Sequence, residues 1–268
     1  MPQPWRLLVD GVGAGPWNMA VDEALLASVV VAGPPTLRFY RWRGPWLSLG
    51  YRQRLDAEQL AACAHGNVGV VRRMTGGRAV LHGEDLTYAV VAREAALPAG
   101  LSATYAFVAE ALQAALASLE VATEPAARPA RERGAPTFDC FAEAAGDELC
   151  AGGRKLVGSA QRRAGGGVLQ HGSIRLAPDP PAVRRAAGLQ PGAATSLSEL
   201  GVEVSIEALV SACRTAFERC LGVGLERAGI SPLERRQARE RESARAAELP
   251  ISIDEPPQGA SRVRLDGR

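Results

Sequence analysis

Residues 140–173 read CFAEAAGDELCAGGRKLVGSAQRRAGGGVLQHGS, a stretch with the pattern of two successive β-hairpins. Glycine-rich turns separate three short runs that favour strands, and the expected strands are 147–150, 155–160 and 168–176. Short connections of this kind join antiparallel neighbours. The stretch therefore predicts antiparallel β-structure at the centre of the fold.

Lys155 begins the middle strand, and it is the only lysine among 31 lysine and arginine residues. A compact ammonium can enter a narrow pocket and release a proton when buried, whereas a guanidinium cannot. Chance survival of one lysine in an arginine-biased coding sequence is the alternative explanation. The glycines at 152, 153 and 158 favour a functional role, because closely spaced glycines let the backbone approach a ligand.

The composition is that of a soluble globular protein. Hydrophobic residues make up 47% of the 268 residues and the formal net charge is +2, so neither a nucleic-acid nor a membrane partner is indicated. The five cysteines include no CxxC pair, and we expect neither a disulfide framework nor a metal site. No signal peptide and no apolar run of about 18 residues is found, so we expect a cytoplasmic protein with free thiols.

The rest of the chain alternates short strands and amphipathic helices. Further strands are expected at 5–10, 36–42, 46–50 and on both sides of a loop at 75–77; helices are expected at 18–30, 57–64, 102–119, 206–221 and 231–247. Residues 11–15 are interpreted as a turn, Asn18 as a helix cap, and 36–50 as a meander. The 231–247 helix is charged and is expected on the surface. Residues 1–248 form one predicted domain, followed by an irregular tail at 249–268.

The first chemical signal is the sequence RRMTGGRAVLH at 72–82. Its paired glycines, Gly76 and Gly77, lie between strands and let backbone N–H groups face an anion or a carbonyl, while Arg73 and Arg78 add positive charge. The spacing matches neither a P-loop nor a dinucleotide-binding motif, and an ordinary hairpin with exposed arginines would look similar. His82 is interpreted as part of a pocket wall.

Two cysteines compete for the role of nucleophile. Cys150 occupies an expected strand position and behaves as a small hydrophobic residue. Cys140 lies in a loop after the preceding helix, where a thiol is freer to reach a substrate. The sequence pattern alone leaves both candidates open.

Several motifs in order make the chain resemble the biotin/lipoate ligase and lipoyl-transferase superfamily. They are NMAVDEAL at 18–25, the segment 37–50, RRMTGGRAVLH at 72–82, GRKLVGSAQ at 153–161 and QHGSI at 170–174. The resemblance implies an α/β (α+β) fold, with a mixed, largely antiparallel β-sheet flanked by helices, and a single catalytic domain. It also implies an acyl group held by these residues: Arg73, Thr75, Gly76, Gly77, Arg78, His82, Gly158, Ser159, Ala160, His171 and Gly172.

Within the superfamily the likeness is greatest to octanoyltransferases, whose pattern places a Cys-Phe pair fifteen residues before the lysine. Cys140 and Phe141 have that spacing from Lys155, which singles out Cys140 as the implied nucleophile and Lys155 as its partner. The implied reaction moves octanoyl from acyl carrier protein, through a Cys140 thioester, to a lysine of a lipoyl domain or of glycine cleavage H protein. An ammonium beside a thiol lowers its pKa, and no cofactor is needed.

Three alternatives remain open from the sequence. An ATP-dependent lipoate ligase, working with a separate accessory subunit, would use Lys155 without Cys140. An amidotransferase between lipoyl proteins would also use a cysteine, although its loop tends to read Gly-Gly-Leu where this chain has Gly76-Gly77-Arg78. A non-catalytic module could dock an acidic carrier protein through Arg131, Arg133, Arg162 and Arg163.

Overall fold

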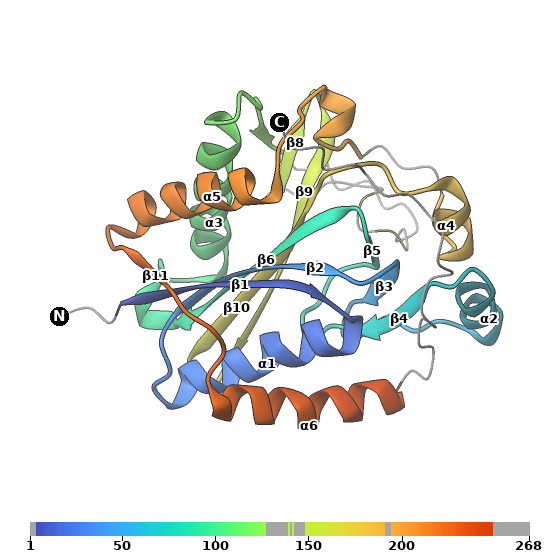
Figure 1. The fold of residues 1–268 in the computed structure, drawn as a ribbon, viewed down its shortest axis with the longest axis horizontal. Coiled ribbons are helices and arrows are strands. Elements are labelled where there is room, and N and C mark those ends of the chain that lie inside the picture. Colours follow the sequence, from blue (N-terminus) through green and yellow to red (C-terminus); the bar gives the residue numbers. More distant parts are fainter. Residues whose placement is uncertain (1–3, 127–138, 140, 142–147, 191–193, 249–268) are drawn as a thin grey trace, which may run out of the picture.

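The computed structural model describes residues 4–126, 139, 141, 148–190 and 194–248. An eight-stranded sheet with the order β11-β1-β2-β6-β10-β9-β8-β7 crosses the molecule (Figure 1). Its strands are β1 (Trp5–Gly13), β2 (Thr36–Trp42), β6 (Asp85–Arg93), β7 (Glu124–Pro125), β8 (Leu149–Ala151), β9 (Arg154–Ala164), β10 (Gly167–Arg175) and β11 (Leu225–Arg227). Strand β1 pairs in parallel with β2 and β11, and the other neighbours are antiparallel. The expected mixed, largely antiparallel sheet is confirmed.

A second sheet of three strands lies beside the first. Its order is β4-β3-β5, from β3 (Trp46–Leu49), β4 (Gly69–Arg72) and β5 (Val80–His82). The predicted meander was therefore wrong, since β2 and β3 are in different sheets. Gly44, with φ of +72°, and Pro45 redirect the chain between them. Helices α2 (Ala57–His65) and α4 (Pro181–Ala186) cover this sheet, whose core includes Leu47 and Cys63.

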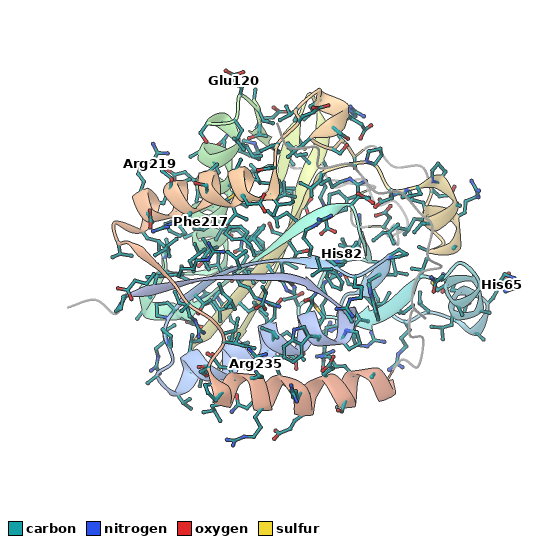
Figure 2. All side chains as sticks on the ribbon, in the orientation of Figure 1. His65, His82, Glu120, Phe217, Arg219 and Arg235 are labelled. Atoms are coloured by element: carbon teal, nitrogen blue, oxygen red, sulfur yellow. The ribbon has the colours of Figure 1, made fainter. Side chains whose placement is uncertain are left out.

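Helices cover both faces of the large sheet. Helices α3 (Leu101–Ala117) and α5 (Ile206–Leu221) pack on one face, and α1 (Gly15–Val31) packs on the other. Strand β6 shows how the sequence sorts its side chains, because alternate residues of a strand point to opposite faces. Tyr88 and Val90 join the α3 and α5 core, while Ala89 and Val91 join the α1 core. Figure 2 shows Phe217 pointing from α5 toward the sheet and Arg219 pointing away.

Helix α1 begins earlier than expected. Its first residue is Gly15 and its N-cap is Ala14, so the predicted turn at 11–15 and the capping role of Asn18 were both wrong. Pro16 lies in the first turn, where its missing N–H costs nothing. The Asn18 side chain instead donates to the carbonyls of Gly13 and Arg41, which ties the helix to the ends of β1 and β2.

The charged helix near the C-terminus, α6 (Pro232–Glu248), packs against α1 (Figure 1). The prediction of a surface helix did not include the two ion pairs that hold it against the rest of the protein. Glu234 is buried and receives two hydrogen bonds from the Arg6 guanidinium, at 2.8 and 2.9 Å. Near the other end of α6, Arg245 pairs with Glu23 of α1. The predicted irregular tail lies outside the described residues.

Two short 3₁₀ turns, Glu94–Ala96 and Ser198–Leu200, complete the secondary structure of the described chain. Within the described ranges, no helix is both long enough and apolar enough to span a bilayer.

Candidate active site

A cavity opens on the α1 side of the large sheet, where it meets the small sheet. Helix α1, strands β2, β5, β6, β9 and β10, and the loop after β4 all contribute to its wall. The lining residues are Met19, Tyr40, Trp42, Arg73, Gly77, Val80, His82, Thr87, Gly158, Ser159, Ala160, His171, Gly172 and Ser173.

The structure brings together residues that the sequence analysis assigned to substrate binding. Eight of them line this cavity: Arg73, Gly77, His82, Gly158, Ser159, Ala160, His171 and Gly172. The other three, Thr75, Gly76 and Arg78, lie on the same loop as Gly77 but outside the lining. Within the described ranges, no group of three or more His, Cys, Asp or Glu side chains is arranged to hold a metal ion.

Arg73 holds the loop in shape from inside. Its guanidinium donates to the carbonyls of Ser48, Gly76 and Arg78 at 2.6, 3.2 and 2.9 Å, and to the Ser48 hydroxyl at 2.7 Å. Its charge, which was expected to face the ligand, is instead directed to the loop backbone and to Ser48 of β3. Gly77 has a φ of +91°, which other residues rarely adopt, so the loop depends on glycine at this position.

Lys155 is buried close to the cavity, at the start of β9 as expected. Its ammonium forms an ion pair with Glu148 at 2.5 Å and lies 4.7 Å from the centre of the Phe141 ring. A Cβ at Gly158 would come within 3.3 Å of the Lys155 Nζ, so glycine at 158 brings this ammonium next to the cavity wall. The attraction between a cation and an aromatic face also favours this position.

Four of the five cysteines are described, and all four are free. Burial raises the pKa of Cys63 to about 11 and that of Cys213 to about 12, and burial also raises the pKa of Cys220. The pKa of Cys150 is raised by burial and by the Glu124 and Glu148 carboxylates, against a smaller opposite effect of Lys155. Cys140 lies outside the described residues, but its neighbours Asp139 and Phe141 do not.

Asp139 and Phe141 are both anchored. The Asp139 carboxylate accepts a hydrogen bond from the Phe141 backbone N–H at 2.8 Å and pairs with Arg184 at 2.8 Å. The Phe141 ring is buried between cationic groups, with the Arg175 guanidinium carbon 5.1 Å from its centre. Phe141 thus lies next to the Lys155 ammonium, and Asp139 is held by Arg184.

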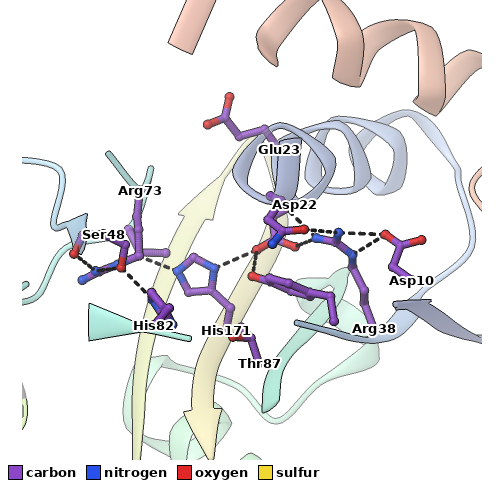
Figure 3. A network of polar contacts seen from close by, with 12 residues as sticks. Asp10, Asp22, Glu23, Arg38, Ser48, Arg73, His82, Thr87 and His171 are labelled. Atoms are coloured by element: carbon purple, nitrogen blue, oxygen red, sulfur yellow. Dashed lines mark hydrogen bonds and ion pairs between the residues drawn. The ribbon is translucent and has the colours of Figure 1, made fainter. Parts of the chain in front are cut away.

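A buried network behind the cavity is centred on Asp22 of α1 (Figure 3). Arg38 donates to the Asp22 carboxylate at 2.6 Å, Tyr40 at 2.9 Å and His171 Nδ1 at 2.8 Å. Burial alone would raise the pKa of Asp22, but the charge of Arg38 and the hydrogen bond from His171 hold it below its ordinary value. His171 Nε2 then accepts from the Thr75 hydroxyl at 2.8 Å, so the network reaches the glycine loop.

A second network runs through His82. Its Nδ1 lies 2.9 Å from the Asp85 carboxylate, its Nε2 lies 2.8 Å from the Ser48 hydroxyl, and its ring stacks on Trp42. Burial would raise the pKa of Asp85, but His82 and hydrogen bonds to the ionised form lower it to about 2. Because Ser48 also binds Arg73, each of the two histidines connects a buried carboxylate to the loop.

Sequence reasoning missed Asp22, Tyr40, Trp42 and Glu148. A signal for Asp22 was present, because it stands between Met19 and Leu25 on the apolar face of its helix, where an acidic residue needs a buried partner. That partner could not be identified, since His171 is 149 positions away. Glu148 and Lys155 lie on opposite arms of one predicted hairpin, so their opposite charges could have indicated that they pair.

Asp22→Asn is expected to destabilise the protein strongly. Arg38 is fully buried and pairs with two carboxylates, those of Asp10 and Asp22. The substitution would leave it with Asp10 alone. Breaking a buried ion pair typically costs about 3–5 kcal/mol, which urea unfolding at pH 7 would measure. Since the pKa of Asp22 is lowered on folding, its contribution is present above about pH 3.9 and is lost as the pH falls through the folded value.

Asp56→Asn is the control for that experiment. Asp56 is exposed and caps α2, a role that asparagine fills equally well, so its effect should be small. A loss of less than about 1 kcal/mol for Asp22→Asn, within the range of an exposed pair, would contradict the importance of the network.

The mixed sheet, its two helical layers and the buried lysine beside the cavity agree with the catalytic domain that the sequence resemblance implied. Residues 15–218 match the lipoyl protein ligase A/B catalytic domain family. The chain belongs to that family.

Curated relatives and solved structures agree with this placement. Octanoyltransferase LipM of Symbiobacterium thermophilum is 40% identical over 89% of this chain and 94% of its own length. Octanoyltransferase LipM of Moorella thermoacetica is 48% identical over 65% of this chain and 66% of its own. The bi-partite lipoate protein ligase of Thermoplasma acidophilum shares the fold, with a TM-score of 0.72 and 22% identity over 97% of this chain and 100% of its own.

Proposed function

We propose that this chain is an octanoyltransferase of lipoate biosynthesis, which transfers octanoyl from acyl carrier protein to a lysine of a lipoyl domain or of glycine cleavage H protein. Two relatives named octanoyltransferase LipM support this function. The observation that carries the chemistry is the buried Lys155 ammonium next to the cavity. The cavity wall includes Met19, Trp42 and Val80, which provide apolar surface for a hydrocarbon chain.

The nucleophile in this proposal is Cys140. Each of the four described thiols has a raised pKa and would be poorly ionised at neutral pH. The contact of Phe141, the residue after Cys140, with the Lys155 ammonium supports Cys140 as the reacting thiol. An enzyme with a catalytic free thiol suits the cytoplasm, where thiols are kept reduced.

Transfer proceeds in two steps. The Cys140 thiolate, stabilised by the Lys155 ammonium, attacks the carrier thioester and its sulfur bonds to the carbonyl carbon. The carrier thiolate leaves and takes up the proton that the Cys140 thiol has lost. The amine of the acceptor lysine then attacks the acyl-enzyme, the carbon–nitrogen bond forms, and the Cys140 sulfur leaves. The proton lost by the nitrogen passes to that sulfur, with Lys155 as the carrier. ATP has no part in either step.

The developing oxyanion needs N–H donors. Gly158 and Ser159 pair with β10 in the ladder of the large sheet. Gly76 and Gly77 lie in a loop outside the strands, and Gly77 lines the cavity, so their N–H groups are the better candidates.

Mass spectrometry of the purified protein after mixing with octanoyl-acyl carrier protein tests the proposal. We expect an added octanoyl group on Cys140 that hydroxylamine removes, and its passage to a lipoyl domain without ATP. A ligase would instead form an adenylate from free lipoate and ATP, and a non-catalytic carrier-binding module would give neither product. Either result would overturn the octanoyltransferase assignment.

A further inference from the structure

The contact between Glu148 and Lys155 is short and enclosed. Their side chains are 8% and 2% exposed, and Oε1 and Nζ are 2.5 Å apart. Hydrogen bonds between ionised groups are shorter and stronger than neutral ones. A buried charge also has to be paired, because transfer out of water is costly. Each member of this pair therefore stabilises the other in its buried position.

The backbone fixes where the two groups meet. Glu148 directly precedes β8, and the two-residue turn at 152–153 joins β8 to β9 with Cys150 opposite Lys155. The register shifts between Leu149 and Cys150, so Glu148 lies beyond an irregularity of this hairpin. Its carboxylate nevertheless reaches the Lys155 ammonium of the neighbouring strand.

A lysine side chain needs a directing contact if its ammonium is to act at one place. It has a flexible four-carbon stem and loses much rotamer freedom when it is held. The Phe141 ring and the space at Gly158 shape the surroundings of Nζ, but they do not supply a negative charge. Glu148 does, while Arg175 adds a further positive charge near the same ring.

We propose that Glu148 is a positioning residue, whose carboxylate holds the Lys155 ammonium beside the place of acyl transfer without touching the substrate itself. The inference rests on the proposed function and deepens it. Glu148 acts on both halves of the reaction through Lys155, because Lys155 serves the Cys140 sulfur in each.

Kinetics of Glu148→Gln test the proposal. Glutamine keeps the size of glutamate and one acceptor oxygen but loses the charge. We expect kcat for octanoyl transfer to fall by about 10- to 100-fold, as when a residue that orients a functional group is removed, with KM unchanged. Glu148→Asp keeps the charge and should recover part of the rate. Glu199→Gln breaks the exposed pair with Arg154 at 3.2 Å, next to Lys155 in sequence, and should behave as the parent.

A spectroscopic measurement tests the pair without using activity. Because Lys155 is the only lysine, protein labelled with ¹⁵N at lysine Nζ gives one side-chain ammonium signal. We expect a protected, observable signal in the parent and in Glu199→Gln, and a shifted or exchange-broadened one in Glu148→Gln.

An unchanged signal in Glu148→Gln would overturn the proposal. A loss of rate that Glu148→Asp does not recover would also overturn it, because a purely structural defect would explain such a loss. If the parent itself formed no octanoyl adduct, the octanoyltransferase assignment would fail, while the ammonium signal would still show whether Glu148 holds Lys155.

Discussion

Lys155→Arg is expected to leave the protein folded and to slow octanoyl transfer on the order of a hundred- to ten-thousand-fold, the usual contribution of a positioned proton-transfer group. Arginine can keep an ion pair with Glu148 and retain a positive charge. It cannot release a proton at any pH that the protein survives. Steady-state transfer from octanoyl-acyl carrier protein to a lipoyl domain would measure the change.

The surroundings of Lys155 give a second reason for this loss. A Cβ at Gly158 would lie 3.0 Å from the Lys155 Cε, so the wall leaves little space for a planar guanidinium. Arg154→Gln, at the exposed neighbouring position, is the control and should retain the rate. A near-parental rate for Lys155→Arg would mean that the lone lysine is an accident of composition.

Cys140→Ala is expected to abolish the octanoyl adduct and to reduce transfer on the order of a million-fold, comparable to loss of the nucleophile in a serine protease. The remaining thiols are poor substitutes, since the pKa of each is raised. Intact-protein mass spectrometry and single-turnover transfer would detect the loss.

Cys150→Ala distinguishes the two cysteines that the sequence left in competition. Cys150 lies opposite Lys155 on the neighbouring strand and is buried, so its removal costs packing but no nucleophile. It should therefore form the adduct at nearly the parental rate. An adduct that survives in Cys140→Ala and disappears in Cys150→Ala would reverse the assignment.

Sequence patterns over neighbouring residues were enough to predict much of the fold. Helix α5 begins and ends where its periodicity places it, at Ile206 and Leu221, and the two hairpins around Lys155 follow their glycine turns. Both depend on residues close in sequence, whose spacing is visible in one chain. The loop of Gly77 and the wall of Gly158 and Ala160 were likewise marked by glycine-rich motifs.

Contacts between distant residues were beyond such reasoning. The separation of β3 from β2 into another sheet, the docking of α6 through Arg6 and Glu234, and the Asp22–His171 bond all join segments whose pairing no local period encodes. Charge patterning placed α6 on the surface correctly, but it could not show that Glu234 finds a buried arginine. Cys140 itself lies outside the described residues, so its role stays a prediction.

The burial of Lys155 affects whether the enzyme can acylate its own side chains. An enzyme that carries an activated acyl group next to free amines risks acylating its own surface. This chain offers no lysine there, since its single lysine is 3% exposed and paired with Glu148, and the guanidinium groups that replace lysine elsewhere are poor acyl acceptors. Under the proposed mechanism, self-modification of its side-chain amines is thus avoided by composition, and the activated acyl group is left for the lysine of a partner protein.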